Sequence, residues 1–163
     1  GNECINFKKE DMNLKNKKVL VTGGAGFVGS NLVKKLIEEQ QANVTVLDDL
    51  FTGNQNFLKN LDCRFVHGSV EDDGLVNQLV KNAEVVFHLA ARNIIVSNAN
   101  PREDLRVNVG GTFNILEACK IHGIERVVYS STASVYGNPK TLPIPEDAPK
   151  EFLSFYSASK FSG

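Results

Sequence analysis

The chain has 163 residues, enough for one domain with a hydrophobic core, and 42% of them are apolar, which excludes an intrinsically disordered protein. The net charge is −1, with 18 basic and 19 acidic residues mixed along the sequence. This balance gives no basic field that attracts nucleic acid or anionic lipid. No apolar run approaches the roughly 18 to 20 residues of a membrane span, so we expect no membrane partner.

The cysteines and the first residues indicate the compartment and the domain limits. Cys4, Cys63 and Cys119 lie far apart and show no CxxC spacing. We therefore expect neither a disulfide framework nor a metal site, and the pattern fits a reducing compartment, the cytoplasm. Residues 1–16 are polar and carry no signal-peptide pattern, so we expect a loose leader there and a single domain over residues 17–163.

Apolar runs and helical patterns alternate along the chain. Five short strands are predicted, over residues 18–22, 43–48, 63–67, 85–89 and 126–131. Helices are predicted over residues 27–40, 72–80 and 108–122, and a last one near Ser157. Residues 138–150 hold four prolines and are predicted to form a loop. Strands that alternate with helices predict an α/β fold of the Rossmann type, a doubly wound parallel sheet covered on both faces.

The two longer predicted helices carry apolar residues at helical spacing. In the first helix, Phe27, Leu32, Val33, Leu36 and Ile37 fall roughly on one face. In the helix over residues 108–122, the apolar positions are Val109, Phe113 and Leu116.

A glycine-rich turn follows the first strand. Gly23, Gly26 and Gly29 are spaced as GxxGxxG, which suits a tight turn, a close approach of the backbone to a pyrophosphate and close packing of helix on strand. Taken alone, the pattern is equally well explained by a plain tight turn. Its place between a strand and an amphipathic helix favours dinucleotide binding.

Asp48 ends the second strand, 25 residues after Gly23. An acid at this place can bind both hydroxyl groups of an adenosine ribose and repels a 2′-phosphate, which favours NAD over NADP. No arginine follows it in the sequence to reverse that preference. The alternative is a solvated carboxylate at a strand end.

Tyr156 and Lys160 are spaced i and i+4, so a helix places them on one face. A phenol has a pKa of about 10, and lowering it by roughly 3 units takes about 4 kcal/mol, which a nearby ammonium in a partly dry site can supply. Ser130 and Thr132 follow the fifth strand, where ligands bind in open parallel sheets. Each pattern alone is common. The order of turn, acid, hydroxyl cluster and Tyr-Lys pair indicates an enzyme.

With these residues in place, the sequence resembles the extended short-chain dehydrogenases/reductases of the NAD-dependent sugar-nucleotide epimerase/dehydratase type. The matching segments are TGGAGFVGSN, VLDDLFTG, VFHLAA, NVGGT, YSSTASVYG and YSASK, which together cover nearly the whole chain from Lys17. The resemblance implies NAD as cofactor, a nucleotide sugar as substrate and a homodimer in the full-length form. It is confined to the family's N-terminal half, so we expect a Rossmann domain truncated before its last strands and before the substrate domain.

The resemblance also implies roles by position. The catalytic set is Thr132, Tyr156 and Lys160, and Tyr156 and Lys160 also approach the cofactor. The other cofactor-binding positions are Gly23, Gly26, Phe27, Val28, Asp48, Asp49, Thr52, Gly53, Ser69, Val70, Leu89, Ala90, Ala91, Asn108 and Ser130.

Three positions bear on the subfamily. Gly68-Ser69 stands where the family often has Gly-Asp, and Asn93 stands where UDP-glucose-type epimerases carry a lysine. Ala133-Ser134 lacks the acids of the sugar 4,6-dehydratases, which favours epimerisation at C4 through a transient 4-keto sugar. A dehydratase, decarboxylase, reductase or non-catalytic NAD-binding fragment is the alternative. We expect the 163 residues by themselves to be inactive on a sugar.

The remaining histidines and arginines of interest have weaker assignments. His67 and His88, at strand ends, are expected to be packed or hydrogen-bonded rather than catalytic. Arg92 and Arg102 are interpreted either as phosphate neighbours or as surface charges.

Overall fold

The computed structural model describes residues 12–163. Their elements are β1 (Lys18–Thr22), α1 (Phe27–Glu38), β2 (Asn43–Asp48), η1 (Gln55–Leu58), β3 (Cys63–His67), α2 (Asp73–Val80), β4 (Val85–His88), α3 (Ile94–Ala99), α4 (Pro101–Asp104), η2 (Leu105–Gly111), α5 (Thr112–His122), β5 (Arg126–Tyr129), η3 (Ala133–Tyr136) and α6 (Phe155–Ser162). No helix among these residues is both long and apolar enough to cross a membrane.

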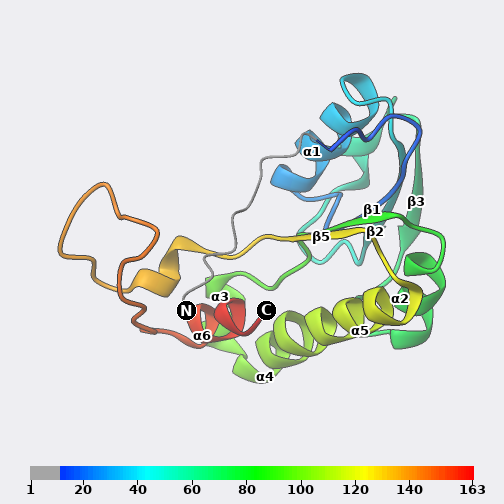
Figure 1. Cartoon of the computed structure of the whole chain (residues 1–163). Helices are drawn as coiled ribbons and strands as arrows, with labels where there is room; N and C mark the ends of the chain where they lie inside the picture. The colour runs from blue at the N-terminus through cyan, green and yellow to red at the C-terminus, as the bar shows by residue number, and fades with distance from the viewer. Residues whose placement is uncertain (1–11) are drawn as a thin grey trace.

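All strand pairs are parallel, in the order β3-β2-β1-β4-β5. Helix α1 covers one face of the sheet, and α2 and α5 cover the other (Figure 1). The predicted doubly wound α/β fold is confirmed. The central strand β1 has β2 on one side and β4 on the other, so the order of the strands reverses at β1. Ligands of such sheets bind in the crevice at the carboxyl ends of the strands at this point.

Two hydrophobic cores form because successive side chains of a strand point to opposite faces. Val19 and Val21 of β1 face α1, whereas Leu20 between them faces α2 and α5. All three are at most 2% exposed. Sheets buried on both faces need such continuous apolar strands, and this explains why β1 has no polar alternation.

The apolar face predicted for α1 is correct for Val33 and Leu36, which are buried, and wrong for Phe27, which is 80% exposed. Phe27 is the first residue of the helix, at the end that meets the glycine turn rather than the sheet. In α5 the inward residues are Ile115, Ala118 and Cys119, and Phe113 and Leu116 are exposed.

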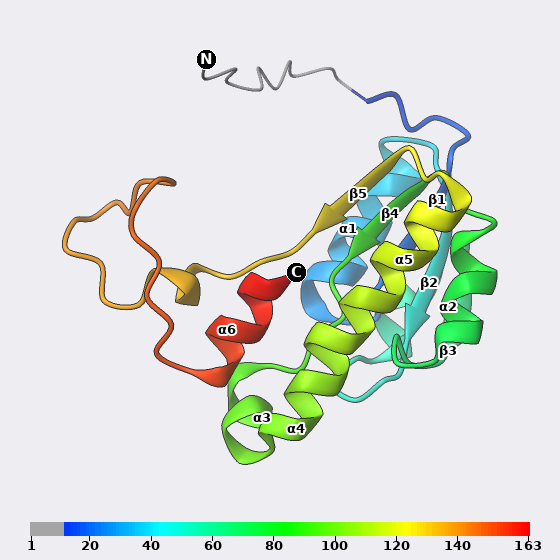
Figure 2. The same ribbon diagram turned by 60° about the horizontal axis from the view of Figure 1, so that its bottom comes forward.

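The helix predicted over residues 108–122 begins earlier. Asn100 caps α4 by accepting a hydrogen bond from the Glu103 N–H, and Pro101 occupies the first turn. The chain then runs through the wider turn η2 into α5. The Asn-Pro start signal was visible in the sequence, and α3 before it was not predicted. Helices α3, α4 and α6 lie together near the start of α5 (Figure 2).

The ends of the described chain differ in packing. Residues 1–11 of the expected leader lie outside the described residues. Leu14, also part of the expected leader, is buried in the core between the sheet and α1. Strand β5 stops at Tyr129, two residues before its predicted end. The proline-rich loop predicted over residues 138–150 spans residues 137–153 and extends away from the sheet (Figure 2).

Candidate active site

The turn between β1 and α1 requires glycine at two places. Gly23 has a φ of +70°, and a Cβ atom there would lie 2.7 Å from the Ala90 backbone nitrogen. A Cβ atom at Gly29 would lie 2.1 Å from the Gly23 carbonyl oxygen. Neither neighbour can move away because both are backbone atoms, so these glycines are needed to bring strand, turn and helix together.

The N-terminus of α1 carries free backbone N–H groups. No side chain of the described residues caps this helix, and its first turn holds no acid. By contrast, Asp72 caps α2 and Ser154 caps α6. The side chains of Phe27 and Val28 are 80% and 62% exposed, so any part that these residues take in cofactor binding would come from their backbone N–H groups. Uncapped N–H groups beside a glycine cradle fit the diphosphate of a dinucleotide.

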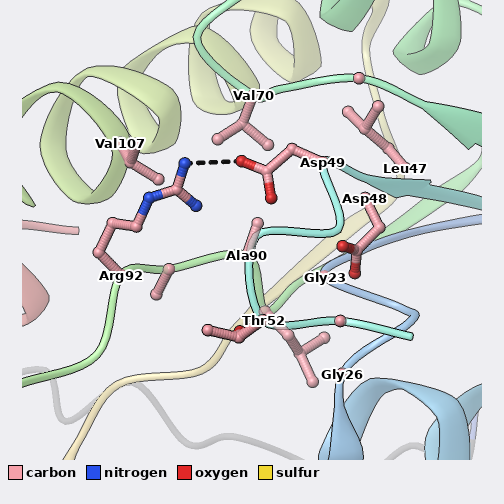
Figure 3. Close-up of a pocket in the computed structure, with 14 residues that line it drawn as sticks. Gly23, Gly26, Leu47, Asp48, Asp49, Thr52, Val70, Ala90, Arg92 and Val107 are labelled. Carbon is pink, nitrogen blue, oxygen red and sulfur yellow. Dashed lines mark hydrogen bonds and ion pairs between the residues drawn. The ribbon is translucent and has the colours of Figure 1, made fainter. Parts of the chain in front are cut away.

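A cavity adjoins this turn at the carboxyl ends of β1, β2 and β4 (Figure 3). It brings together ten of the residues predicted to bind the cofactor: Gly23, Gly26, Asp48, Asp49, Thr52, Gly53, Val70, Leu89, Ala90 and Ala91. Four lining residues were not predicted as cofactor-binding: Leu47, Gly68, Arg92 and Val107.

Asp48 is 7% exposed and connects the glycine turn before α1 to the loop after β2. Its Oδ2 accepts a hydrogen bond from the Ala25 N–H at 2.9 Å, and its Oδ1 accepts one from the Leu50 N–H at 2.8 Å. Each carboxylate oxygen has a second lone pair. Asp48 can therefore hold the glycine turn and still accept hydrogen bonds from a ribose.

Arg92 is a buried cation at the cavity wall. Its side chain is 8% exposed, Nη2 lies 2.7 Å from Asp49 Oδ2, and Nε lies 3.0 Å from Glu103 Oε1. The guanidinium also lies 4.0 Å from the centre of the Phe51 ring. Burial lowers the pKa of Arg92, but the hydrogen bonds and charges of Asp49 and Glu103 together outweigh it, so the pKa is raised. The surface interpretation of Arg92 is thus wrong. Although no arginine stands directly after Asp48 in the sequence, the fold brings Arg92 to the wall of the same cavity.

Three predicted or noted residues lie beside the cavity rather than in its lining. Ser69 Oγ accepts a hydrogen bond from the Glu71 N–H at 3.1 Å and fixes the turn before α2. Asn93, at the position of the family's lysine, caps α3 through Oδ1. Asn108 is 1% exposed and its Oδ1 accepts a hydrogen bond of 2.7 Å from the Arg92 N–H, so it holds the loop after β4.

His88 is 1% exposed and hydrogen-bonded at both nitrogens, as expected for a packed residue. Thr112 donates its hydroxyl proton to the Asn108 carbonyl oxygen at 2.6 Å, so it must accept from His88 Nε2–H at 2.9 Å. Nδ1 then accepts from the Thr22 hydroxyl at 2.6 Å. Burial lowers the pKa of His88 to about 3, with a smaller contribution from Lys160. A neutral imidazole with one fixed tautomer links β1, β4 and α5.

Helix α6 carries Tyr156 and Lys160 one turn apart, and Ser154 begins it with a capping box to Ser157. Lys160 is 3% exposed. Its ammonium lies 4.2 Å from the centre of the Tyr129 ring, and its carbonyl oxygen accepts hydrogen bonds from the Tyr129 and Ser131 hydroxyl groups. Burial lowers the pKa of Lys160 to about 8, opposed by Asp104. These contacts hold α6 on the end of β5.

The hydroxyl cluster after β5 lies beside α6. Thr132 Oγ1 caps η3 by accepting a hydrogen bond from the Ser134 N–H at 3.2 Å. The Ser130 N–H donates to the His88 carbonyl oxygen at 3.1 Å. The structure thus forms a cavity suited to a dinucleotide, and α6, which carries Tyr156 and Lys160, packs against η3, which Thr132 caps. Sequence reasoning missed the contacts of Tyr129 because its partner Lys160 lies 31 residues away.

The chain is similar to known proteins in sequence and in fold. The model of the NAD dependent epimerase/dehydratase family matches residues 19–163. A putative UDP-glucose 4-epimerase of Methanocaldococcus jannaschii is 44% identical over 148 residues, which are 89% of this chain and 48% of that protein. A dTDP-glucose 4,6-dehydratase of Mycobacterium tuberculosis is 41% identical over 152 residues, 88% of this chain and 45% of that protein.

Solved structures agree with the sequence comparison. The UDP-glucose 4-epimerase of Thermotoga maritima, solved with UDP-glucose, has a TM-score of 0.84 at 37% identity, over 89% of this chain and 48% of that one. The UDP-glucose 4-epimerase of Thermus thermophilus, solved with NAD, has a TM-score of 0.81 at 36% identity, over 88% and 47%. The chain spans about half the length of these relatives. It belongs to the NAD-dependent epimerase/dehydratase family, and its cofactor is NAD.

Proposed function

We propose that this chain is the cofactor-binding and proton-transferring half of an enzyme that epimerises a nucleotide sugar, a UDP-hexose, at C4. The observation that carries the proposal is Lys160. Lys160 shares a face of α6 with Tyr156, and its ammonium is buried against the ring of Tyr129 in β5. No carboxylate of the described residues forms an ion pair with this ammonium. A buried amine without an ionic partner is costly to the fold, which supports a role in function.

The proposed chemistry is proton transfer at the C4 hydroxyl group. Tyr156 as phenolate removes the hydroxyl proton, the positive charge of Lys160 favours that phenolate, and Thr132 orients the sugar hydroxyl through its remaining hydrogen-bonding capacity. When bound in the cavity, NAD would supply the reversible hydride acceptor for C4. When the 4-keto sugar has turned over in the site, Tyr156 gives the proton back. The residues named earlier for the cavity and the α1 N-terminus would hold the cofactor.

A 4,6-dehydratase is the second candidate, because a relative 41% identical bears that name. Removal of water from a sugar needs a further acid and base besides the tyrosine. Ala133 and Ser134, the two residues after Thr132, have no carboxyl group. This favours epimerisation. A non-catalytic NAD-binding fragment stays the alternative for the 163 residues alone.

Two further proposals concern assembly and compartment. Exposed apolar side chains lie on α5 (Phe113, Leu116) and α6 (Phe155, Phe161), which supports a homodimer in the full-length protein. Cys63 and Cys119 are free thiols, which supports a reducing compartment such as the cytoplasm.

The test uses a protein that carries this chain together with a substrate-binding half, incubated with NAD and UDP-glucose or dTDP-glucose. The 4-epimer of UDP-glucose is expected, without net formation of NADH. A 4-keto-6-deoxy product from dTDP-glucose would establish the dehydratase instead, and stoichiometric NADH would establish a net oxidoreductase. Residues 1–163 alone, assayed in parallel, should bind NAD without converting either sugar nucleotide, because the groups that orient a sugar are missing.

A further inference from the structure

Arg92 is the one basic residue among the described residues that line the cavity. Three contacts fix its guanidinium: Asp49 from the loop after β2, Glu103 from α4, and the face of the Phe51 ring. Figure 3 shows the guanidinium directed into the cavity toward Asp49. An arginine in this position has the planar donor geometry that binds phosphate, but one of its two terminal nitrogens, Nη2, is paired with Asp49 Oδ2.

The charges around Arg92 are unbalanced. Arg106 is the second cation, and it pairs with Glu103 and, at 3.0 Å, with Glu71. Together with Asp48 and Asp49, the cluster holds four carboxylates and two guanidinium groups. An anion that enters the cavity therefore meets a negative field although an arginine lines it, because carboxylates neutralise both arginines.

We propose that Arg92 is a masked phosphate-binding residue and that Asp49, by pairing with it, makes the cavity accept an adenosine with free ribose hydroxyl groups instead of one with a 2′-phosphate. The inference deepens the proposed function and rests on NAD occupying this cavity. It assigns cofactor choice to the Asp49–Arg92 pair in addition to Asp48. Loss of the Asp49 charge frees the guanidinium edge for a phosphate.

The test is Asp49→Asn in the purified chain, with NAD⁺, NADP⁺, AMP and adenosine 2′,5′-bisphosphate titrated by calorimetry. An asparagine keeps the oxygen that accepts the Phe51 N–H at 3.0 Å, so the loop after β2 should fold as before, which the unfolding temperature checks. The ratio of the NADP to the NAD dissociation constant should fall by at least about tenfold. The ratio for the bisphosphate against AMP should fall in parallel, and both effects should weaken in high salt.

Two variants distinguish the release of the Arg92 guanidinium from a general loss of negative charge near the cavity. Glu71→Gln removes one negative charge of similar exposure from Arg106 and leaves the Asp49–Arg92 pair intact, so the ratio should change by less than about twofold. Asp49→Asn combined with Arg92→Gln should lose the gain. Equal effects of Asp49→Asn and Glu71→Gln, or a gain that survives without Arg92, would overturn the inference. Failure of the folded wild-type chain to bind NAD at all would instead refute the cofactor site, and the inference with it.

Discussion

The ammonium of Lys160 lies 4.2 Å from the centre of the Tyr129 ring, and the Tyr129 hydroxyl donates a 3.1 Å hydrogen bond to the carbonyl oxygen of the same lysine. Tyr129 thus contacts both the side-chain ammonium and the backbone carbonyl group of Lys160. Its own burial raises its pKa to about 12, with smaller contributions from Tyr156 and Asp104, so it stays a neutral phenol. The folded chain therefore carries a buried cation stabilised by an aromatic face, and this arrangement has measurable consequences.

Replacing the buried amine should stabilise the fold. The pKa of Lys160 falls from 10.5 to about 8 on folding, so below pH 8 the charge destabilises the folded state by up to about 3 kcal/mol. Lys160→Met should raise the free energy of unfolding at pH 7 by an amount of that order. The gain should shrink as the pH rises from about 8 to 10.5, where the amine becomes neutral in both states. Urea denaturation across this range measures it.

Lys150 provides the matched control. It is exposed, and its ammonium lies 4.0 Å from the centre of the Tyr136 ring. Lys150→Met makes the same chemical change at the surface and should alter the free energy of unfolding by less than about 0.5 kcal/mol. If Lys160→Met and Lys150→Met change the free energy of unfolding by the same amount, the buried charge of Lys160 is not the cause.

His88 should make the fold sensitive to acid. Its pKa is 6.5 when unfolded and about 3 when folded, so its contribution to stability is complete above pH 6.5 and is lost as the pH falls toward 3. Between about pH 6.5 and 4.5 this loss amounts to about 2 to 3 kcal/mol. His88→Gln should lower stability at pH values above that range, because it breaks the bonds to Thr22 and Thr112, and should remove this part of the pH dependence.

The comparison for His88 is His67→Gln, which removes an exposed imidazole at the end of β3. Free energies of unfolding of the three proteins at about pH 7.5 and about pH 4.5 decide the matter. If His88→Gln and the wild type lose the same free energy between the two pH values, His88 does not carry the acid sensitivity.

Asp48 should be needed both for the fold of the turn and for NAD. Asp48→Ala leaves the buried N–H groups of Ala25 and Leu50 without their acceptors, and each costs about 1 to 3 kcal/mol. Calorimetry should show NAD bound more tightly than NADP by the wild type, and both bound weakly by the variant. Asp62→Ala, just before β3, is the control. Equal affinities of the wild type for the two cofactors would contradict the assignment of Asp48 to the ribose.

Tyr156 should be needed for chemistry and dispensable for cofactor binding. In a protein that joins this chain to a substrate-binding half, Tyr156→Phe should lower kcat by at least about a hundredfold, because only the proton-transferring hydroxyl is lost. The dissociation constant of NAD should change by less than about threefold. The control is Tyr136→Phe, which removes a hydroxyl that donates to the Glu146 carbonyl oxygen in the proline-rich loop. Retained epimerisation in Tyr156→Phe would remove this tyrosine from its role.

The sequence by itself determined the order of the five strands and of α1, α2, α5 and α6, the glycine turn and the acid at the end of β2. These features are local: apolar runs, the spacing of Gly23 and Gly29, and the four-residue separation of Tyr156 and Lys160 all act within one or two elements. The early start of the helix that ends in α5 was also readable, from Asn100 and Pro101. Because such signals depend on neighbouring residues, they predict elements and their ends.

Only the tertiary structure decided which charges are buried and what they contact. Arg92 meets Asp49 across 43 residues of sequence, and His88 meets Thr22 across 66. In the sequence, Arg92 is one of five arginines and His88 one of two strand-end histidines. Burial removes water from such groups, so their protonation and partners are set by whatever the fold brings within hydrogen-bonding distance. Hydrophobic periodicity carries no information about those distances, and for this reason the cofactor cavity was predictable and the pairing of Arg92 with Asp49 was not.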